Sequence, residues 1–231
     1  SFYEKSNIEL RVGVRATTIN PMARTVALGE SESLAYDDLI IATGARARKL
    51  PIPGADLPQV HELRNATDAD RLKAGLGSAK RIAIVGGGYI GLEVAASARA
   101  LGVEVIVLER EARVLARVAN PVLSAFFTGY HRQHGVEIRT GVEIVGFESD
   151  GVRLADDRLV AADCILVGIG ATPNEELARA AGLVCEAGIC VDETARTSDP
   201  HIFAIGDVTW RPLPFSGRIG RIESVPSAME Q

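Results

Sequence analysis

A glycine-rich segment carries the strongest chemical pattern in this 231-residue sequence. Gly86, Gly88 and Gly91 follow an apolar run with the spacing G-x-G-x-x-G, and helix-forming residues come directly after them. A second apolar run ends on Glu109, 23 residues after Gly86. A strand, a glycine turn, a helix and a second strand that ends on an acid are typical of a dinucleotide-binding site.

Each residue type in this pattern has a physical reason. Gly86 permits the tight turn, Gly88 lets the backbone approach a pyrophosphate, and Gly91 lets the helix pack closely on the strand. The start of the helix offers unpaired N–H groups and a positive dipole end to the phosphates. Glu109 can accept hydrogen bonds from ribose hydroxyls and would repel a 2′-phosphate, which predicts NADH rather than NADPH. The alternative is a glycine-rich turn that binds nothing.

A second acid lies at the end of another apolar run. The segment 202–205 leads into Gly206-Asp207, and ligands of α/β proteins bind at the carboxyl ends of the strands. A carboxylate there suits the hydroxyls of a polyol, while the alternative is that Asp207 caps the next helix. A third apolar run, 39–42, leads into Thr43-Gly44.

Composition narrows the classes of partner. The net charge of −5 argues against nucleic acid. No apolar run approaches the ~18 residues that span a bilayer, so no membrane contact is predicted. Three cysteines suit the reducing cytoplasm, which is the predicted location. Cys185 and Cys190 have C-x4-C spacing, but their context predicts a β-hairpin in which both fill strand positions, rather than a redox pair.

Other local patterns give further expectations. Alternation predicts a strand over 8–14, and Thr67 is a plausible N-cap of a helix over 66–76. His131 and His134 lie three residues apart at the end of a predicted helix over 121–134. We interpret them as a solvated helix end, because no acid or thiol at suitable spacing completes a metal site, and we predict none.

Three separated motifs together resemble the flavoprotein family with two dinucleotide domains that includes glutathione reductase. They are Ala42-Thr43-Gly44-Ala45, the segment 86–93 with Glu109, and the segment 204–207. The tail, 221–231, is more closely similar to the NADH-dependent ferredoxin reductases of bacterial oxygenase systems, the putidaredoxin-reductase-like group.

This resemblance implies an α/β fold with two Rossmann-like domains, the NAD domain being inserted into the FAD domain. Residues 1–73 would form the first FAD segment, 74–197 the NAD domain and 198–231 the returning FAD segment. The N-terminal βαβ unit and the C-terminal interface domain of the family have no counterpart in these residues, and the sequence starts without Met. We therefore expect a fragment.

The resemblance also assigns site residues. Those expected to contact FAD are Thr43, Gly44, Arg48, Asp207, Val225 and Pro226. Those expected around NAD are Gly86, Gly88, Tyr89, Ile90, Gly91, Glu93, Glu109, Arg110, Arg117, Gly168, Ile169 and Gly170. Glu93 would point toward the junction of nicotinamide and flavin, and it is the one candidate for a catalytic role.

The implied function is an FAD-dependent oxidoreductase that passes electrons from NADH to a ferredoxin-type [2Fe-2S] protein serving an oxygenase. An NADH oxidase, a peroxidase or a disulfide reductase of the same fold stays open, as does a binding flavoprotein of the apoptosis-inducing-factor type. Ferredoxins are usually acidic, so a local basic patch formed by Arg211, Arg218 and Arg221 is the predicted dock. The alternative is that these arginines are solvated loop residues or structural ion pairs. The oligomeric state is left open.

Overall fold

The protein is described by a computed structural model that covers residues 2–213 and 217–229. The chain divides into two compact units, Ser1–Arg46 with Pro173–Gln231 (unit 1) and Ala47–Thr172 (unit 2). It crosses between them within β5 (Ala45–Ala47) and again within β14 (Ala171–Pro173), and these two strands pair. Among the described residues, no helix has both the length and the apolar character needed to cross a bilayer.

Unit 2 is built on a five-stranded parallel sheet. Its strands, in spatial order, are β6 (Val60–His61), β13 (Cys164–Val167), β7 (Arg81–Val85), β8 (Glu104–Glu109) and β9 (Val136–Thr140). Neighbouring residues of β7 point to opposite faces, yet Ile82, Ala83, Ile84 and Val85 are each no more than 4% exposed. The sheet is therefore covered on both sides, which explains why its strands are continuously apolar.

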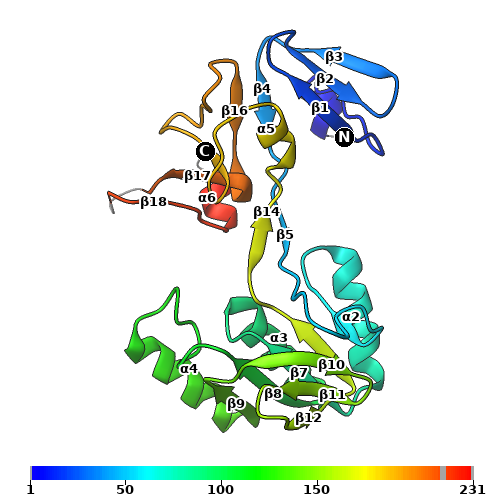
Figure 1. Ribbon diagram of the computed structural model, residues 1–231, viewed down its shortest axis with the longest axis vertical. Helices are drawn as coiled ribbons and strands as arrows, with labels where there is room; N and C mark the ends of the chain where they lie inside the picture. The colour runs from blue at the N-terminus through cyan, green and yellow to red at the C-terminus, as the bar shows by residue number, and fades with distance from the viewer. Residues whose placement is uncertain (1, 214–216, 230–231) are drawn as a thin grey trace. The chain divides into compact units, whose positions relative to one another are not determined.

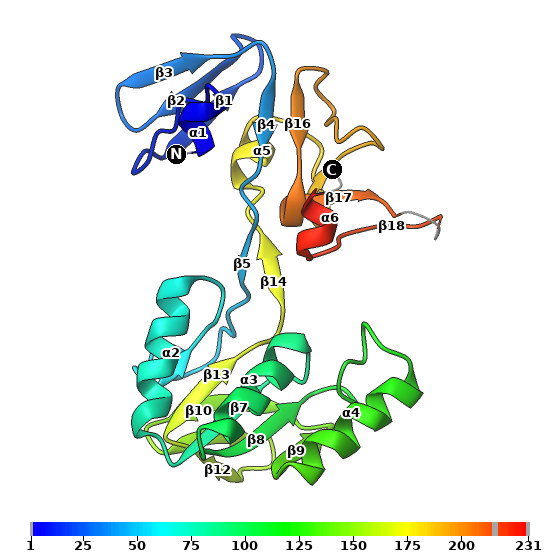
Figure 2. The same cartoon turned by 180° about the vertical axis from the view of Figure 1, so that it is seen from behind.

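Helices and a second sheet provide the two covers (Figure 1). Apolar residues of α2 (Ala66–Ser78) and α3 (Tyr89–Ala100) pack on one face. The antiparallel strands β10 (Ile144–Glu148), β11 (Gly151–Leu154) and β12 (Leu159–Ala161) cover the other. The view from behind in Figure 2 shows α4 (Pro121–Gln133) beside β9.

The predicted helix over 66–76 forms as α2 and begins at Ala66, but its N-cap lies two residues before the expected one. Asn65, not Thr67, is the N-cap: its side-chain oxygen accepts a hydrogen bond from the Asp68 N–H (3.0 Å). The Asp68 carboxylate in turn accepts from the Asn65 N–H (3.1 Å). This reciprocal capping box satisfies two backbone N–H groups at the start of the helix. The helix is therefore capped at Asn65 and not at Thr67.

Unit 1 contains three small sheets around one apolar core. The first is antiparallel and comprises β1 (Ala16–Asn20), β2 (Thr25–Leu28) and β3 (Glu32–Ala35). The second pairs β4 (Leu39–Ile41) in parallel with β16 (Ile202–Ala204). The third comprises β15 (Ile189–Cys190), β17 (Thr209–Pro212) and β18 (Ile219–Gly220). The helices are α1 (Phe2–Lys5), α5 (Glu176–Ala180), the 3-10 turn η1 (Gly206–Val208) and α6 (Val225–Met229).

The strand predicted over 8–14 is wrong. This segment has no strand structure, and Ile8, Leu10, Val12 and Val14 are 47–77% exposed. A strand needs a hydrogen-bonded neighbour, and within the described residues β1, β2 and β3 pair only with one another.

The limits of the compact units differ from the predicted limits of the domains. The segment 47–73 supplies β6 and α2, which pack with the parallel sheet of unit 2. The segment 173–197 supplies α5 and β15 to unit 1, where β15 pairs with β17. Unit 2 therefore starts earlier, and ends earlier, than the predicted NAD domain of residues 74–197.

Candidate functional site

The three glycines of the turn after β7 meet three different surroundings. Gly86 has φ +107°, and a Cβ there would lie 2.4 Å from the Gly168 carbonyl oxygen. A Cβ at Gly91 would lie 2.1 Å from the Gly86 carbonyl oxygen. A Cβ at Gly88 would meet no atom within 4 Å. The first and third glycines are thus needed for the fold, whereas the second leaves open space that a ligand can use.

The helix that follows begins at this open space. Gly88 is the N-cap of α3 and supplies no side-chain cap for the first turn. Tyr89 and Ile90, in that first turn, are 61% and 39% exposed. Uncapped N–H groups and the positive end of the helix dipole make this terminus suitable for a phosphate.

Glu109, at the end of β8, faces the same turn. Its Oε2 accepts a hydrogen bond from the Gly87 N–H at 2.6 Å, and its Oε1 accepts one from the Glu111 N–H at 2.8 Å. Carboxylate oxygens have about four acceptor positions, so two bonds leave capacity for ribose hydroxyls. The carboxylate therefore braces the turn and keeps acceptors for a ligand.

The segment after β13 completes this edge of the sheet. The Gly168 N–H donates to the Val85 carbonyl (2.8 Å), which places it directly beside the glycine turn. An ideal Cβ at Gly170 would lie 3.3 Å from a guanidinium nitrogen of Arg117. Arg117 therefore borders the Gly168–Gly170 segment.

Two other predicted NAD residues are more exposed. The Arg110 side chain is 82% exposed and meets Glu111 only at 3.4 Å. Glu93 is exposed on α3. All the residues predicted to surround NAD lie in unit 2.

In unit 1, two predicted FAD segments leave adjacent strands at the same end. The Ile205 N–H donates to the Ile41 carbonyl at 3.0 Å, which extends the parallel pairing of β4 and β16. Thr43-Gly44 and Gly206-Asp207 each begin two residues after the end of these strands. The interpretation of Asp207 as the N-cap of a helix does not hold, because it lies inside η1.

The third predicted FAD segment packs beside the second. An ideal Cβ at Gly206, in η1, would lie 3.8 Å from the Ala228 Cβ of α6. The Arg211 Nη2 donates to the Ser227 Oγ at 2.8 Å and ties β17 to the same helix. Val225, at the start of α6, is 72% exposed and offers an apolar contact. The Gly206-Asp207 turn and α6 therefore lie close together in unit 1.

These contacts change the interpretation of the predicted basic patch. Arg211 is half-buried and bonded to Ser227, so it holds α6 in place. The Arg221 side chain is 15% exposed and pairs with Glu223 at 2.5 Å. Arg218 is exposed. Arg211 and Arg221 therefore have structural contacts, which argues against an open patch of the three arginines.

The cysteines behave as strand filler. Cys185 faces Ile189 across an antiparallel bridge and packs against the core of unit 1, as the hairpin prediction requires. Cys190 comes next to Ile189 in β15, and adjacent strand residues point to opposite faces. Burial raises the pKa of both thiols, which disfavours the reactive thiolate.

His131 is not the solvated residue that we predicted. It is 7% exposed. Burial is the main cause that lowers its pKa, and the neighbouring His134 lowers the pKa further. Within the described parts of the chain, no three His, Cys, Asp or Glu side chains gather as metal ligands would.

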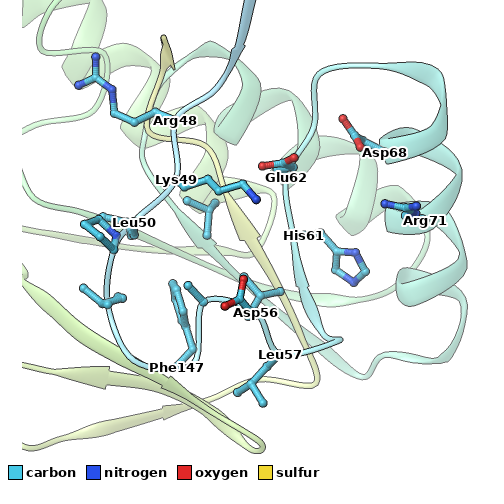
Figure 3. A pocket seen from close by; sticks show the side chains of 15 residues that line it. Arg48, Lys49, Leu50, Asp56, Leu57, His61, Glu62, Asp68, Arg71 and Phe147 are labelled. Carbon is cyan, nitrogen blue, oxygen red and sulfur yellow. The ribbon is translucent and has the colours of Figure 1, made fainter. Parts of the chain in front are cut away.

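A pocket of about 500 Å³ lies in unit 2, and no residue of the glycine turn lines it. Figure 3 shows Arg48 and Lys49 on one side of it, and Glu62 and Arg71 on the β6–α2 side. The Arg48 side chain is exposed here, while its backbone N–H donates to the Gly170 carbonyl at 2.9 Å. Cations and acids both line this pocket, so it favours no one class of charged ligand.

Comparison with known proteins gives the family. The model of the pyridine nucleotide-disulphide oxidoreductases matches residues 3–231. The chain belongs to this family. A probable ferredoxin reductase of Castellaniella defragrans is 47% identical over 99% of the chain, and the putidaredoxin reductase of Pseudomonas putida is 41% identical over 99%. The chain spans 58% and 57% of the lengths of these relatives.

A solved structure agrees. The covalent complex of putidaredoxin reductase with putidaredoxin contains a chain that superposes with a TM-score of 0.95 at 41% identity. The superposition covers 100% of the present chain and 58% of the other. The predicted family resemblance and the α/β dinucleotide-binding fold are therefore confirmed.

Proposed function

We propose that this chain is the dinucleotide-binding part of an NADH-dependent flavoprotein reductase that delivers electrons to a ferredoxin-type [2Fe-2S] protein. The main support is the turn in which Gly86 and Gly91 must lack a Cβ while Gly88 faces open space. The chain is similar over 99% of its length to proteins named as a probable ferredoxin reductase and a putidaredoxin reductase. This similarity supports a ferredoxin as the electron acceptor.

The residues of unit 2 would bind and orient NADH. The uncapped first turn of α3 would hold the pyrophosphate, Glu109 the adenosine ribose, and Gly168–Gly170 with Arg117 the nicotinamide end. Further NAD contacts are proposed for Tyr89, Ile90, Glu93 and Arg110. Among the residues that the structure describes, no side chain needs to act as a general acid or nucleophile in this proposal.

The residues of unit 1 would hold FAD. Asp207 would accept a hydrogen bond from a ribityl hydroxyl, Thr43 and Gly44 would lie against the cofactor, and Val225 with Pro226 would lie by the isoalloxazine. When both cofactors are bound, NADH supplies a hydride and FAD divides the electron pair into single-electron steps. The protein contributes position and electrostatics.

Service to an oxygenase system and a cytoplasmic location are part of the same proposal. The first is suggested by relatives such as the reductase component of the biphenyl dioxygenase system of Paraburkholderia xenovorans. The second rests on three free cysteines with no disulfide.

Steady-state oxidation of NADH by the FAD-loaded protein tests the proposal, with ferredoxin, oxygen, peroxide and a disulfide offered separately. We expect turnover to depend on ferredoxin. Faster turnover with oxygen, peroxide or a disulfide would favour an oxidase, a peroxidase or a disulfide reductase instead. Tight FAD binding without turnover on any acceptor would favour a binding protein.

A further inference from the structure

Asn174 joins the turn after β4 to the chain that returns from β14. Its backbone N–H donates to the Gly44 backbone carbonyl (2.9 Å), and its side-chain Nδ2 donates to the Thr43 backbone carbonyl (2.8 Å). Its own carbonyl accepts from the Thr43 hydroxyl (2.7 Å). All three residues belong to unit 1. One residue thus makes three hydrogen bonds to a two-residue turn that lies 131 positions away in the sequence.

A charged pair fixes the amide of Asn174. The Arg46 Nη1 donates to the Asn174 Oδ1 at 2.7 Å, and the Arg46 Nη2 contacts the Glu176 Oε1 at 2.7 Å. A guanidinium only donates and a backbone carbonyl only accepts, so just one orientation of the amide satisfies both Arg46 and Thr43. The Arg46–Glu176 pair is exposed and adds little stability by itself. Its effect is to orient the amide.

These bonds determine what the turn can offer to a ligand. Both backbone carbonyls of Thr43-Gly44 accept hydrogen bonds from Asn174, and the Thr43 hydroxyl donates its proton to the Asn174 backbone carbonyl. In the part of the chain that the structure describes, the N–H groups of Thr43 and Gly44 have no backbone acceptor. Gly44 has φ +63°, a conformation that a side chain disfavours. The turn therefore keeps its acceptors turned toward Asn174 and leaves these two N–H groups without a backbone acceptor in the described part of the chain.

We propose that Asn174 is a positioning residue that holds the Thr43-Gly44 turn with its N–H groups directed to acceptor atoms of the flavin cofactor. This inference rests on the proposed binding of FAD by unit 1. Asn174 itself acts through the turn, and Arg46 acts through Asn174.

The test is FAD affinity in the protein, measured by reconstitution of the apoprotein and flavin fluorescence. We expect Asn174→Ala to weaken FAD binding at least tenfold. Asn174→Asp keeps the acceptor for Arg46 but places an oxygen against the Thr43 carbonyl, so we expect it not to rescue binding. Arg46→Met should weaken binding less, because the bonds from Asn174 to the turn persist.

A matched control separates positioning from general stability. Asn120 caps α4 in unit 2, and its side chain accepts from the Leu123 N–H at 2.9 Å. Asn120→Ala should lower the unfolding temperature and leave FAD affinity unchanged. If Asn174→Asp binds FAD like the unmutated protein, Asn174 only anchors Arg46 and the inference is overturned. Unchanged affinity in Asn174→Ala also overturns it, whereas an unmutated protein that binds no FAD overturns the proposed function.

Discussion

The Glu109 Oε2 accepts a hydrogen bond from the Gly87 N–H at 2.6 Å, so the acid at the end of β8 supports the turn at the end of β7. The neighbouring strands run parallel and end at the same edge of the sheet. One carboxylate can therefore serve two purposes, bracing the turn and accepting from a ribose.

Glu109→Ala should raise the KM for NADH by about tenfold or more, since a hydrogen bond to a charged group contributes about 1.5–3 kcal/mol. The unmutated protein should prefer NADH to NADPH, because the carboxylate repels a 2′-phosphate. Glu111→Ala is the matched control: the backbone N–H that Glu109 accepts from is retained. Steady-state kinetics with both cofactors measures these effects, and equal kcat/KM for NADH and NADPH would contradict the assignment.

The three glycines should separate folding from binding. Gly91→Ala puts a Cβ 2.1 Å from the Gly86 carbonyl oxygen and should destabilise the protein by about 1–3 kcal/mol. Gly88→Ala meets open space and should fold normally, yet weaken NADH binding about tenfold by occupying the place of the pyrophosphate. Thermal unfolding and NADH titration measure the two effects. Normal NADH affinity in Gly88→Ala would remove the pyrophosphate from this turn.

Sequence reasoning worked best where the chemistry is local. The glycine spacing and the continuous apolar run of β7 are contained in a few neighbouring residues, and the structure has the turn and the buried strand expected there. It failed for the segment 8–14, where alternation is present but a pairing partner is required. It also missed Asn174, because its bonds to Thr43 span 131 positions and leave no local pattern.

The arginines show the same limit from the other side. Three cations within eleven residues suggest a patch, but the contact of Arg211 with Ser227 depends on how β17 and α6 pack. Charge can be counted from a sequence, whereas the partner of each charge is decided by tertiary structure.

Cys164 should make stability depend on pH. The residue is 1% exposed, and the pKa of its thiol is raised to about 11. Burial is the main cause of this rise, and the negative charge of Asp163 is the second. An unfolded thiol ionises near pH 8.5, so its contribution is complete below that pH and is lost as pH rises toward the folded value. The difference in unfolding free energy between the unmutated protein and Cys164→Ala should therefore be about 2–3 kcal/mol smaller at pH 11 than at pH 8. Denaturant titrations at both pH values measure this, and a constant difference would contradict it.

Asp207→Ala should weaken retention of FAD, because it removes the acceptor proposed for a ribityl hydroxyl. Asp207→Asn keeps one acceptor oxygen and should lose less. Flavin content after dilution and gel filtration measures retention. A stoichiometric flavin content in Asp207→Ala would show that this carboxylate does not hold the cofactor.

Arg218 and Arg211 should respond differently when each is changed to Glu. Arg218 is exposed, so Arg218→Glu should slow reduction of an acidic ferredoxin severalfold at low salt, and the difference should shrink as salt screens the contact. Its reduction of a small artificial acceptor by NADH should stay normal. Arg211→Glu breaks the bond to Ser227 and should impair both reactions, since α6 carries Val225 and Pro226 beside the proposed flavin site. Stopped-flow measurement of the two half-reactions distinguishes these outcomes. Normal ferredoxin reduction by Arg218→Glu would place the dock outside this segment.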